Sequence, residues 1–265
     1  MSKTRLGTYK NTVASSDYIS YLSCYQANNS TSVFDVSGKG NDLLFNQGRS
    51  NLSIAEAWGV SNTLSTVYSG ASASAKGVFL PASIINSIDF SKGEGIIICC
   101  TVLLTTPLAS TGFIAQGSST TDTGIRVGVT STNLLKPSFY STTEQVYFPD
   151  PSAITPGVPT RVLLYFGGIN QTLNFACFLN ETSNQPAITS TVTTGSISPT
   201  SRVEPLFLGM YKISTNNYAS VTASFSSIHM IKVQNISNVT YEKLKDIAVR
   251  YKISPNSVLT QDETL

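Results

Sequence analysis

The chain of 265 residues is long enough for one large β-sandwich or two small domains, and its sequence shows no linker. Only 12% of its residues are charged and the formal net charge is +2, whereas ordinary soluble domains carry about 25% charged residues. The positive charge is small and the basic residues are scattered, which argues against nucleic-acid binding. Ser, Thr and Asn supply most of the polarity, as in many extracellular and virion β-proteins.

Residues 1–16 are polar, carry Lys3, Arg5 and Lys10, and are predicted to form an N-terminal arm that docks the protein onto a particle or a neighbouring subunit. No apolar segment follows the first basic residues, so the sequence predicts no signal peptide. The most apolar run, Ile96 to Leu104, spans nine residues, whereas a membrane helix needs about 20. We therefore expect a chain that is made in a cytoplasm and does not insert into a membrane.

The segment FDVSGKGNDLLF, residues 34–45, resembles a phosphate-binding loop because it places a Gly-Lys pair between apolar residues. Such a loop needs a Gly five residues before its Gly-Lys pair and a Ser or Thr after it, but Val33 and Gly40 occupy these positions. The residue types favour a structural turn instead, because Gly accepts positive φ, and Asn, Asp and Ser bond their own backbone. The predicted turn residues are Asp35, Ser37, Gly38, Gly40 and Asn41.

Further along the chain, apolar residues follow the two-residue period of β-strands. Ile96 to Leu104 is apolar on both faces, which predicts a central strand buried on both sides. Ile125, Val127 and Val129 alternate with Arg126 and a glycine, which predicts one buried face.

Val162 to Phe166 and Leu173 to Leu179 are predicted to form a hairpin with a loop of about five or six residues, because Gly167 and Gly168 begin the intervening segment. Four residues of the second strand are expected to share a face: Leu173, Phe175, Cys177 and Leu179. Two further strands are predicted at Leu206 to Tyr211 and Phe225 to Val233.

One segment near the C-terminus has the pattern of an amphipathic helix. Thr240 can cap its start and Glu242 lies near the positive end of the helix dipole. The apolar positions at helical spacing are Leu244, Ile247, Ala248 and Tyr251. Residues 253–265 are predicted to be a polar tail, so the whole chain is expected to be an all-β protein with one short helix.

The cysteines are Cys24, Cys99, Cys100 and Cys177, and without an export signal we expect buried free thiols rather than disulfides. Adjacent Cys99 and Cys100 would point to opposite faces of a strand, so no zinc site is predicted. Asp122 and Asp150 are isolated loop acids, where calcium would need several oxygen ligands. We predict no metal and no cofactor.

Catalytic patterns are weak in this sequence. A retaining sandwich glucanase would carry paired carboxylates about 5 Å apart, but the Glu-x-Asp-x-x-Glu pattern does not occur, and Asp89 with Glu94 is the least unlikely pair. His229 is the only histidine and is expected to be a core imidazole on the face of Ser227, Ile231 and Val233. We therefore assign no catalytic residue and expect no enzyme.

Aromatic side chains supply the candidate ligand contacts, because aromatic faces stack on sugar rings and nearby polar groups bond the sugar hydroxyls. The candidates are Trp58, Tyr140, Tyr147 and Asp150. The alternative for the aromatic residues is a place in the core.

Five segments, in order, resemble the concanavalin A-like, laminin-G-like jelly-roll domains. They are the turn at residues 35–41, the apolar strand at 95–104, TPGVPTRVLLYFGGINQTLNFACFLN at 155–180, PLFLGM at 205–210, and FSSIHMIKVQNISNVTYEKLKDIA at 225–248. The resemblance implies one two-sheet antiparallel jelly-roll sandwich over residues 17–252.

This fold hosts both enzymes and binding proteins, so two functions follow. The first is a non-enzymatic virion structural protein of a bacteriophage, either a capsid-decoration protein or a tail-associated adhesion module. Its partners would be other virion proteins, further copies of itself, or a host-surface glycan, and assembly would place it on the virion without secretion. The alternative is a carbohydrate-active enzyme or its carbohydrate-binding domain.

Overall fold

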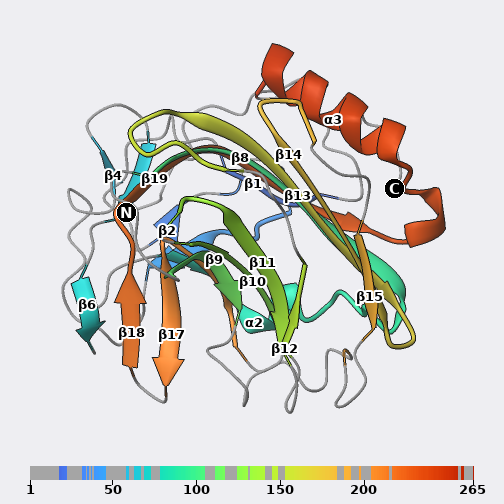
Figure 1. Cartoon of the computed structure of the whole chain (residues 1–265), viewed down its shortest axis with the longest axis horizontal. Coiled ribbons are helices and arrows are strands. Elements are labelled where there is room, and N and C mark those ends of the chain that lie inside the picture. The colour runs from blue at the N-terminus through green and yellow to red at the C-terminus, as the bar shows by residue number, and fades with distance from the viewer. Residues whose placement is uncertain are drawn as a thin grey trace, which may run out of the picture.

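The computed structural model describes residues 18–22, 32–33, 35, 37, 39–45, 58–59, 63–66, 69–72, 78–104, 111–116, 124–130, 132–140, 145–148, 153–183, 188–191, 197, 204–214, 217–255, 258–259 and 265. These residues form two large antiparallel sheets, a smaller sheet beside them, and a C-terminal helix on the outside (Figure 1). The predicted all-β sandwich with a short C-terminal helix is confirmed. In this described part no helix is long and apolar enough to cross a membrane, and the predicted arm at residues 1–16 lies outside it.

The first sheet is built around the long strand β8. Among the described residues its strand order is β15 (Ile188–Thr191), β14 (Thr172–Leu179), β13 (Thr160–Ile169), β8 (Lys92–Leu104), β19 (Ala223–Val233), β5 (Thr63–Thr66) and β4 (Trp58–Gly59), and β1 (Tyr18–Leu22) also pairs with β19.

The second sheet packs face to face against the first. Its order is β12 (Gln145–Tyr147), β11 (Leu135–Tyr140), β10 (Gly124–Val129), β9 (Thr111–Gln116), β16 (Leu206–Leu208), β7 (Val78–Leu80), β3 (Leu43–Phe45) and β2 (Ser32–Val33). The smaller sheet contains β17 (Met210–Ser214), β18 (Asn217–Ser220) and β6 (Ser69–Ser72). Among the described residues the helical elements are α2 (Ala82–Ile85), η2 (Ile236–Asn238) and α3 (Tyr241–Ile253).

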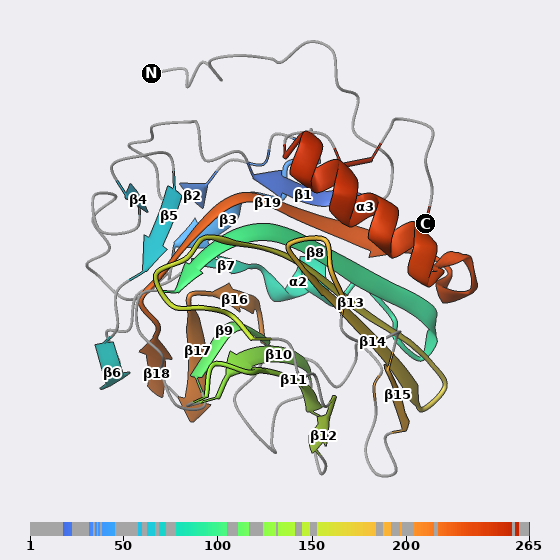
Figure 2. The same cartoon turned by 45° about the horizontal axis from the view of Figure 1, so that its top comes forward.

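Strand β8 contributes to two separate cores. Ile96, Ile98 and Cys100 point into the core between the two sheets, which also holds the inward side chains of β10, β13 and β14. Ile97 and Cys99 point to the opposite face, where α3 covers the first sheet (Figure 2). The prediction of a strand buried on both sides is confirmed, as is the placing of the adjacent cysteines on opposite faces.

The hairpin of β13 and β14 differs from the prediction in its loop. The register is continuous up to the last pair of residues, so the loop is Asn170 and Gln171 alone, and the longer predicted loop is wrong. Asn170 takes the left-handed conformation that a two-residue hairpin requires, with φ of 55°. Gly167 and Gly168 lie inside β13, paired with Asn174 and Leu173. Glycine suits both positions because a Cβ on Gly167 would collide with the hydroxyl of Tyr165, and one on Gly168 would lie 2.9 Å from the carbonyl oxygen of Phe90.

The strand predicted from Leu206 to Tyr211 is two strands. Gly209 has φ of 71°, which breaks the extended backbone between β16 and β17. The chain therefore leaves the second sheet at Leu208 and enters the smaller sheet at Met210.

Strand β19 carries a β-bulge that decides where the only histidine points. Between Ser226, opposite Thr101, and His229, opposite Cys99, β19 contains one residue more than β8, and Ser227 has φ of 48°. The extra residue reverses the alternation, so that Phe225 faces the core between the sheets but His229 faces α3. His229 shares its face with Ile231 and Val233, as predicted, whereas Ser227, the third residue predicted there, lies in the bulge.

Helix α3 begins and packs as predicted. The side chain of Thr240 accepts a hydrogen bond from the backbone N–H of Lys243, and the four predicted apolar residues are buried against the first sheet. The predicted polar tail does not simply leave the domain, because Val258, Leu259 and Leu265 are buried in the same core. We call α3 and these three residues the helix layer.

The turn at residues 35–42 is organised by one carboxylate. Asp35 is only 4% exposed, and its two oxygens accept hydrogen bonds from the backbone N–H groups of Ser37 at 2.8 Å and Asn41 at 3.0 Å. Asp42 accepts one from the backbone N–H of Asp35 at 2.8 Å. Gly40 has φ of +76°, and Gly38 lies outside the described residues.

Replacing Gly40 by valine should lower the free energy of unfolding by about 1 kcal/mol or more, because a β-branched residue is strained at positive φ. A Cβ at this position would meet nothing within 4 Å, so the expected cost comes from backbone strain and not from crowding of the Cβ. Urea denaturation measures the change. Gly40→Asn is the control and should lose less, since Asn tolerates the left-handed region; equal stability of Gly40→Val and the wild type would contradict the prediction.

Candidate functional site

The predicted ligand residues lie on different sheets. Trp58 is in β4 of the first sheet, whereas Tyr140 and Tyr147 are in β11 and β12 of the second sheet. Both views show β4 and β12 well apart from each other (Figures 1 and 2). The structure therefore does not bring Trp58 next to the tyrosines, and Asp150 lies outside the described residues.

Tyr140 supports another side chain and is not an open stacking surface. It is only 5% exposed, and its hydroxyl accepts a hydrogen bond from Nη1 of Arg126 at 2.9 Å. Tyr147 pairs in register with Ser138, which in turn is the register partner of Arg126. Tyr140 therefore contacts Arg126 of β10, and Tyr147 lies in the same row of register partners as Arg126.

A row of residues crosses the second sheet at this point. In an antiparallel sheet, residues directly opposite each other share a face, and eight successive register partners run from edge to edge: Tyr147, Ser138, Arg126, Ala115, Phe207, Phe79, Leu44 and Ser32. This face points away from the first sheet, since the alternate residues Ile125 and Val127 fill the core between the sheets. We call it the Arg126 face.

Arg126 is held between two aromatic rings on this face. Its guanidinium carbon lies 4.7 Å from the ring centroid of Tyr211 and 6.0 Å from that of Tyr140, within the range of a cation–π attraction. Gly112 makes room for it, because a Cβ there would lie 2.9 Å from Nε of Arg126. Arg126 and Tyr211 are both partly exposed.

The Arg126 face contains both buried side chains and partly exposed ones. Ala115, Ser138 and Phe207 are almost fully buried, whereas Phe79 and Leu44 are partly exposed and the rings of Phe79 and Phe207 meet edge to face at 6.0 Å. Lys136, two residues from Ser138 on the same strand face, is also partly exposed. A guanidinium donates hydrogen bonds in one plane, and aromatic rings offer apolar surface, so this face can hold a ligand with adjacent hydroxyl or anionic oxygens.

Arg126 and Tyr211 were not among the residues that the sequence singled out. The alternation of Arg126 with Ile125 and Val127 does predict that its side chain points outward. Tyr211 follows Gly209 on another strand, and its meeting with Arg126 depends on the pairing of distant strands.

Asp89 and Glu94, the least unlikely catalytic pair, are engaged in structural contacts. Oδ1 of Asp89 accepts from the backbone N–H and the hydroxyl of Ser91, and Oδ2 pairs with Lys92. Burial raises the pKa of Asp89, but the hydrogen bonds from Ser91 and Lys92 outweigh it and hold the pKa below its usual value. This is opposite to the raised pKa that a carboxylic acid needs to act as a general acid at neutral pH.

Glu94 ties the start of β8 to the end of β19. Its Oε2 accepts from the backbone N–H of Asp89 at 2.6 Å, and its Oε1 lies 2.8 Å from Nζ of Lys232. Lys232 also donates to the carbonyl oxygen of Ser87 at 3.1 Å. These contacts link three segments and account for both oxygens of the carboxylate.

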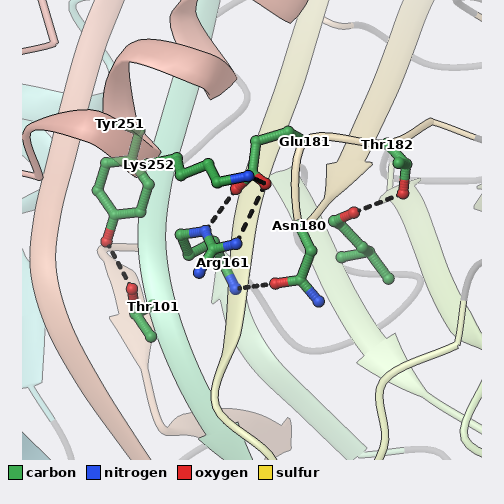
Figure 3. A network of polar contacts seen from close by, with 8 residues as sticks. Thr101, Arg161, Asn180, Glu181, Thr182, Tyr251 and Lys252 are labelled. Atoms are coloured by element: carbon green, nitrogen blue, oxygen red, sulfur yellow. Dashed lines mark hydrogen bonds and ion pairs between the residues drawn. The ribbon is translucent and has the colours of Figure 1, made fainter.

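A second polar network joins α3 to the end of the β13–β14 hairpin (Figure 3). Glu181 pairs with Nε of Arg161, accepts from Nη2 of Arg161 at 3.1 Å, and lies 3.2 Å from Nζ of Lys252 on α3. The hydrogen bond from Arg161 is the main cause of a lowered pKa of Glu181. Asn180 and Glu181 both have positive φ, 47° and 65°, in the tight turn that presents the carboxylate.

Metal-binding groups do not gather in the described part of the chain: no three His, Cys, Asp or Glu side chains there are placed to hold an ion. Cys99, Cys100 and Cys177 are buried thiols, as predicted, while Cys24 falls outside the described residues.

The sequence matches no family model and no curated protein. Solved structures do resemble the fold. A mutant of Trypanosoma rangeli sialidase displaying trans-sialidase activity superposes with a TM-score of 0.59 at 11% identity, covering 91% of this chain and 34% of the sialidase chain. The chain therefore spans about a third of that sialidase.

Two further structures are similar to most of the chain. The Ruminococcus gnavus IT-sialidase CBM40 bound to α2,3-sialyllactose has a TM-score of 0.50 at 13% identity, covering 70% of this chain and 96% of the other. The binding domain of botulinum neurotoxin DC, in complex with rat synaptotagmin II, has a TM-score of 0.51 at 13% identity, covering 92% and 52%. At these identities the likeness shows the β-sandwich fold alone.

Proposed function

We propose that this chain is a non-enzymatic binding module whose Arg126 face recognises carbohydrate. The observation that carries the proposal is the guanidinium of Arg126, oriented by the hydroxyl of Tyr140 and packed against the ring of Tyr211 on an outward sheet face. Protein–sugar contacts combine stacking on aromatic rings with hydrogen bonds to adjacent hydroxyls. The name of the similar R. gnavus domain, a carbohydrate-binding module with a bound sialyllactose, supports the proposal by analogy of fold.

We favour binding over hydrolysis because both carboxylates of the candidate catalytic pair are engaged in structural contacts. Asp89 and Glu94 are the pair that the sequence analysis considered for catalysis. The carboxylate of Asp89 binds Ser91 and Lys92, and that of Glu94 binds Lys232 and the backbone N–H of Asp89. The alternative of a carbohydrate-active enzyme would require a free acid with a raised pKa, and the pKa of Asp89 is lowered.

Replacing Arg126 by alanine should weaken glycan binding about tenfold or more, because a charge-assisted hydrogen bond contributes roughly 1.5–3 kcal/mol. A glycan array identifies the ligands, and calorimetry with the best of them gives the dissociation constants. Arg250→Ala is the matched control: Arg250 lies on α3, on the other side of the molecule, in an ion pair with Asp246. Equal weakening by both substitutions, or an array without any bound glycan, would reject the Arg126 face as a carbohydrate site.

We further propose that the module belongs to a virion, as a capsid-decoration or tail-associated adhesion protein. The support is compositional: a low fraction of charged residues, a surface chemistry of Ser, Thr and Asn, and the polar basic arm at residues 1–16, which suits docking onto a particle. The partners would then be other virion proteins or further copies of this chain. Mass spectrometry of purified particles should detect the chain, and its absence from them would end this part of the proposal.

A further inference from the structure

The only histidine of the chain is buried between the first sheet and the helix layer. His229 is 0% exposed, and its Nε2 lies 2.6 Å from the carbonyl oxygen of Pro255, just beyond the end of α3. Its ring meets that of Tyr251 edge to face at 5.7 Å. The Tyr251 hydroxyl in turn is hydrogen-bonded to Thr101 at 3.0 Å (Figure 3). It also donates to the carbonyl oxygen of Ser226 at 3.2 Å.

This position of the imidazole depends on a strained piece of backbone. The bulge residue Ser227 has φ of 48°, and without the extra residue His229 would point into the core between the sheets. Strained backbone of this kind persists only where surrounding contacts hold it, and it is often found at functional elements. Here it directs an ionisable ring at the residues that end α3.

A second titratable group holds the same helix. Glu181 joins Lys252 of α3 to Arg161 of β13, so its negative charge helps to fix the C-terminal turn of α3 to the first sheet (Figure 3). His229 and Glu181 therefore act on one boundary, that between the first sheet and the helix layer. The core between the two sheets is a separate cluster of side chains.

We propose that the helix layer is acid-sensitive: acidification releases α3 and the C-terminal residues from the first sheet while the two-sheet core stays folded. Protonation of His229 would place a charge in a fully buried site, where it lacks the hydration that the released state provides. Protonation of Glu181 would remove its ion pairs with Arg161 and Lys252. Both events weaken the same boundary, and units with separate cores can open locally.

The pH window follows from the direction of each pKa. Burial lowers the pKa of His229 to about 4, although the hydrogen bond to Pro255 raises it, whereas the unperturbed value is 6.5. The released state thus binds the proton more readily, so stability is fully present above pH 6.5 and is lost as the pH falls toward 4. Glu181, with its lowered pKa, contributes stability above its usual 4.5 and loses it at lower pH.

Within the described part of the chain, the thiol of Cys99 and the phenol of Tyr251 lie on the same face as His229 and do not change this sign. Burial raises the pKa of Cys99 on β8, Tyr251 faces the imidazole from α3, and Tyr21 is the register partner of His229 on β1. Thiols and phenols are protonated and neutral throughout the acidic range. The transition between pH 6.5 and 4.5 is therefore assigned to His229.

Pulsed hydrogen exchange tests the proposal: the protein is incubated at pH 7.5 to 4.5 and labelled in a short pulse at one fixed pH. The equilibrium constant for release of α3 should rise about 50-fold between pH 7 and 4.5, from the two pKa values by linkage. Amides of β8 and β13 should stay protected. In His229→Gln, which cannot titrate in this range, the rise should disappear, whereas in Glu181→Gln it should remain.

The single histidine gives a second measurement that needs no variant. Its ring resonances in the NMR spectrum should titrate well below pH 6.5, together with the loss of α3 protection. Titration near 6.5 with α3 unchanged would overturn the proposal. So would simultaneous loss of protection in α3 and β8, because the protein would then be unfolding as a whole.

Discussion

Replacing Phe175 by alanine should lower the free energy of unfolding by about 3–5 kcal/mol, the usual cost of removing a buried aromatic ring. Phe175 on β14 is 0% exposed in the core between the two sheets. Its ring centroid lies 4.9 Å from that of Phe166 and 5.4 Å from that of Phe148. Both neighbours belong to hydrogen-bonded strands or their immediate ends, so the cavity cannot collapse. Urea denaturation followed by circular dichroism measures the loss.

Ile169→Ala is the control for this substitution. Ile169 lies in the same hairpin but is 44% exposed, so truncating it should change the stability by no more than about 0.5 kcal/mol. A loss at Phe175 as small as that at Ile169 would mean that the three rings do not form the packed cluster described here.

The second large effect is expected at Gly95, where alanine should cost about 3 kcal/mol by overpacking. A Cβ on Gly95 would lie 2.5 Å from the carbonyl oxygen of Phe166 and 3.0 Å from Cα of Gly167. Gly95 and Gly167 face each other in register between β8 and β13. The obstructing atoms belong to the backbone of a central strand, which cannot move aside without breaking its ladder.

Gly157→Ala separates crowding from backbone strain. Gly157 has φ of +77°, but a Cβ there would meet nothing within 4 Å, so alanine should cost only about 1 kcal/mol. The comparison of the two melting transitions is the measurement. Equal losses of stability in the two variants would show that the backbone of Phe166 leaves more room beside Gly95 than the structure indicates.

The carbohydrate proposal and the acid-release proposal concern opposite sides of the molecule. The Arg126 face is the outer face of the second sheet, while the helix layer covers the outer face of the first sheet. The core between the sheets lies between them. A variant such as His229→Gln is therefore expected to leave glycan binding unchanged, and Arg126→Ala to leave the pH response unchanged.

Local patterns in the sequence predicted most of the elements correctly. The apolar run on β8 predicted burial on both faces, and the alternation on β10 and β14 predicted which residues enter the core. Thr240 and the helical spacing after it predicted α3 to within two residues of its end. These predictions succeed because the period of apolar residues and the capping preference depend only on neighbours along the chain.

The candidate site was less accessible to sequence reasoning. Of the predicted ligand residues, Tyr140 contacts Arg126 but is buried, and Tyr147 lies one strand further along the same row of register partners. Trp58 belongs to the other sheet. The residue type alone does not show whether an aromatic side chain lies in a core, at a sheet edge or on a binding face. Burial depends on what covers the residue, which the local pattern does not contain.

Local sequence was enough to predict the two-residue and helical periods, the turn residues around Asp35, and the cap of α3, because each is a preference of a short segment. The tertiary structure decided the strand register that aligns Arg126 with Ser138 and Ala115, the contact of Arg126 with Tyr211, and the bulge that turns His229 toward α3. It also decided that Gly167 stays in a strand and that Leu265 is buried. A register shift of one residue moves every side chain to the other face, and register is set by the pairing of strands that are distant in the chain.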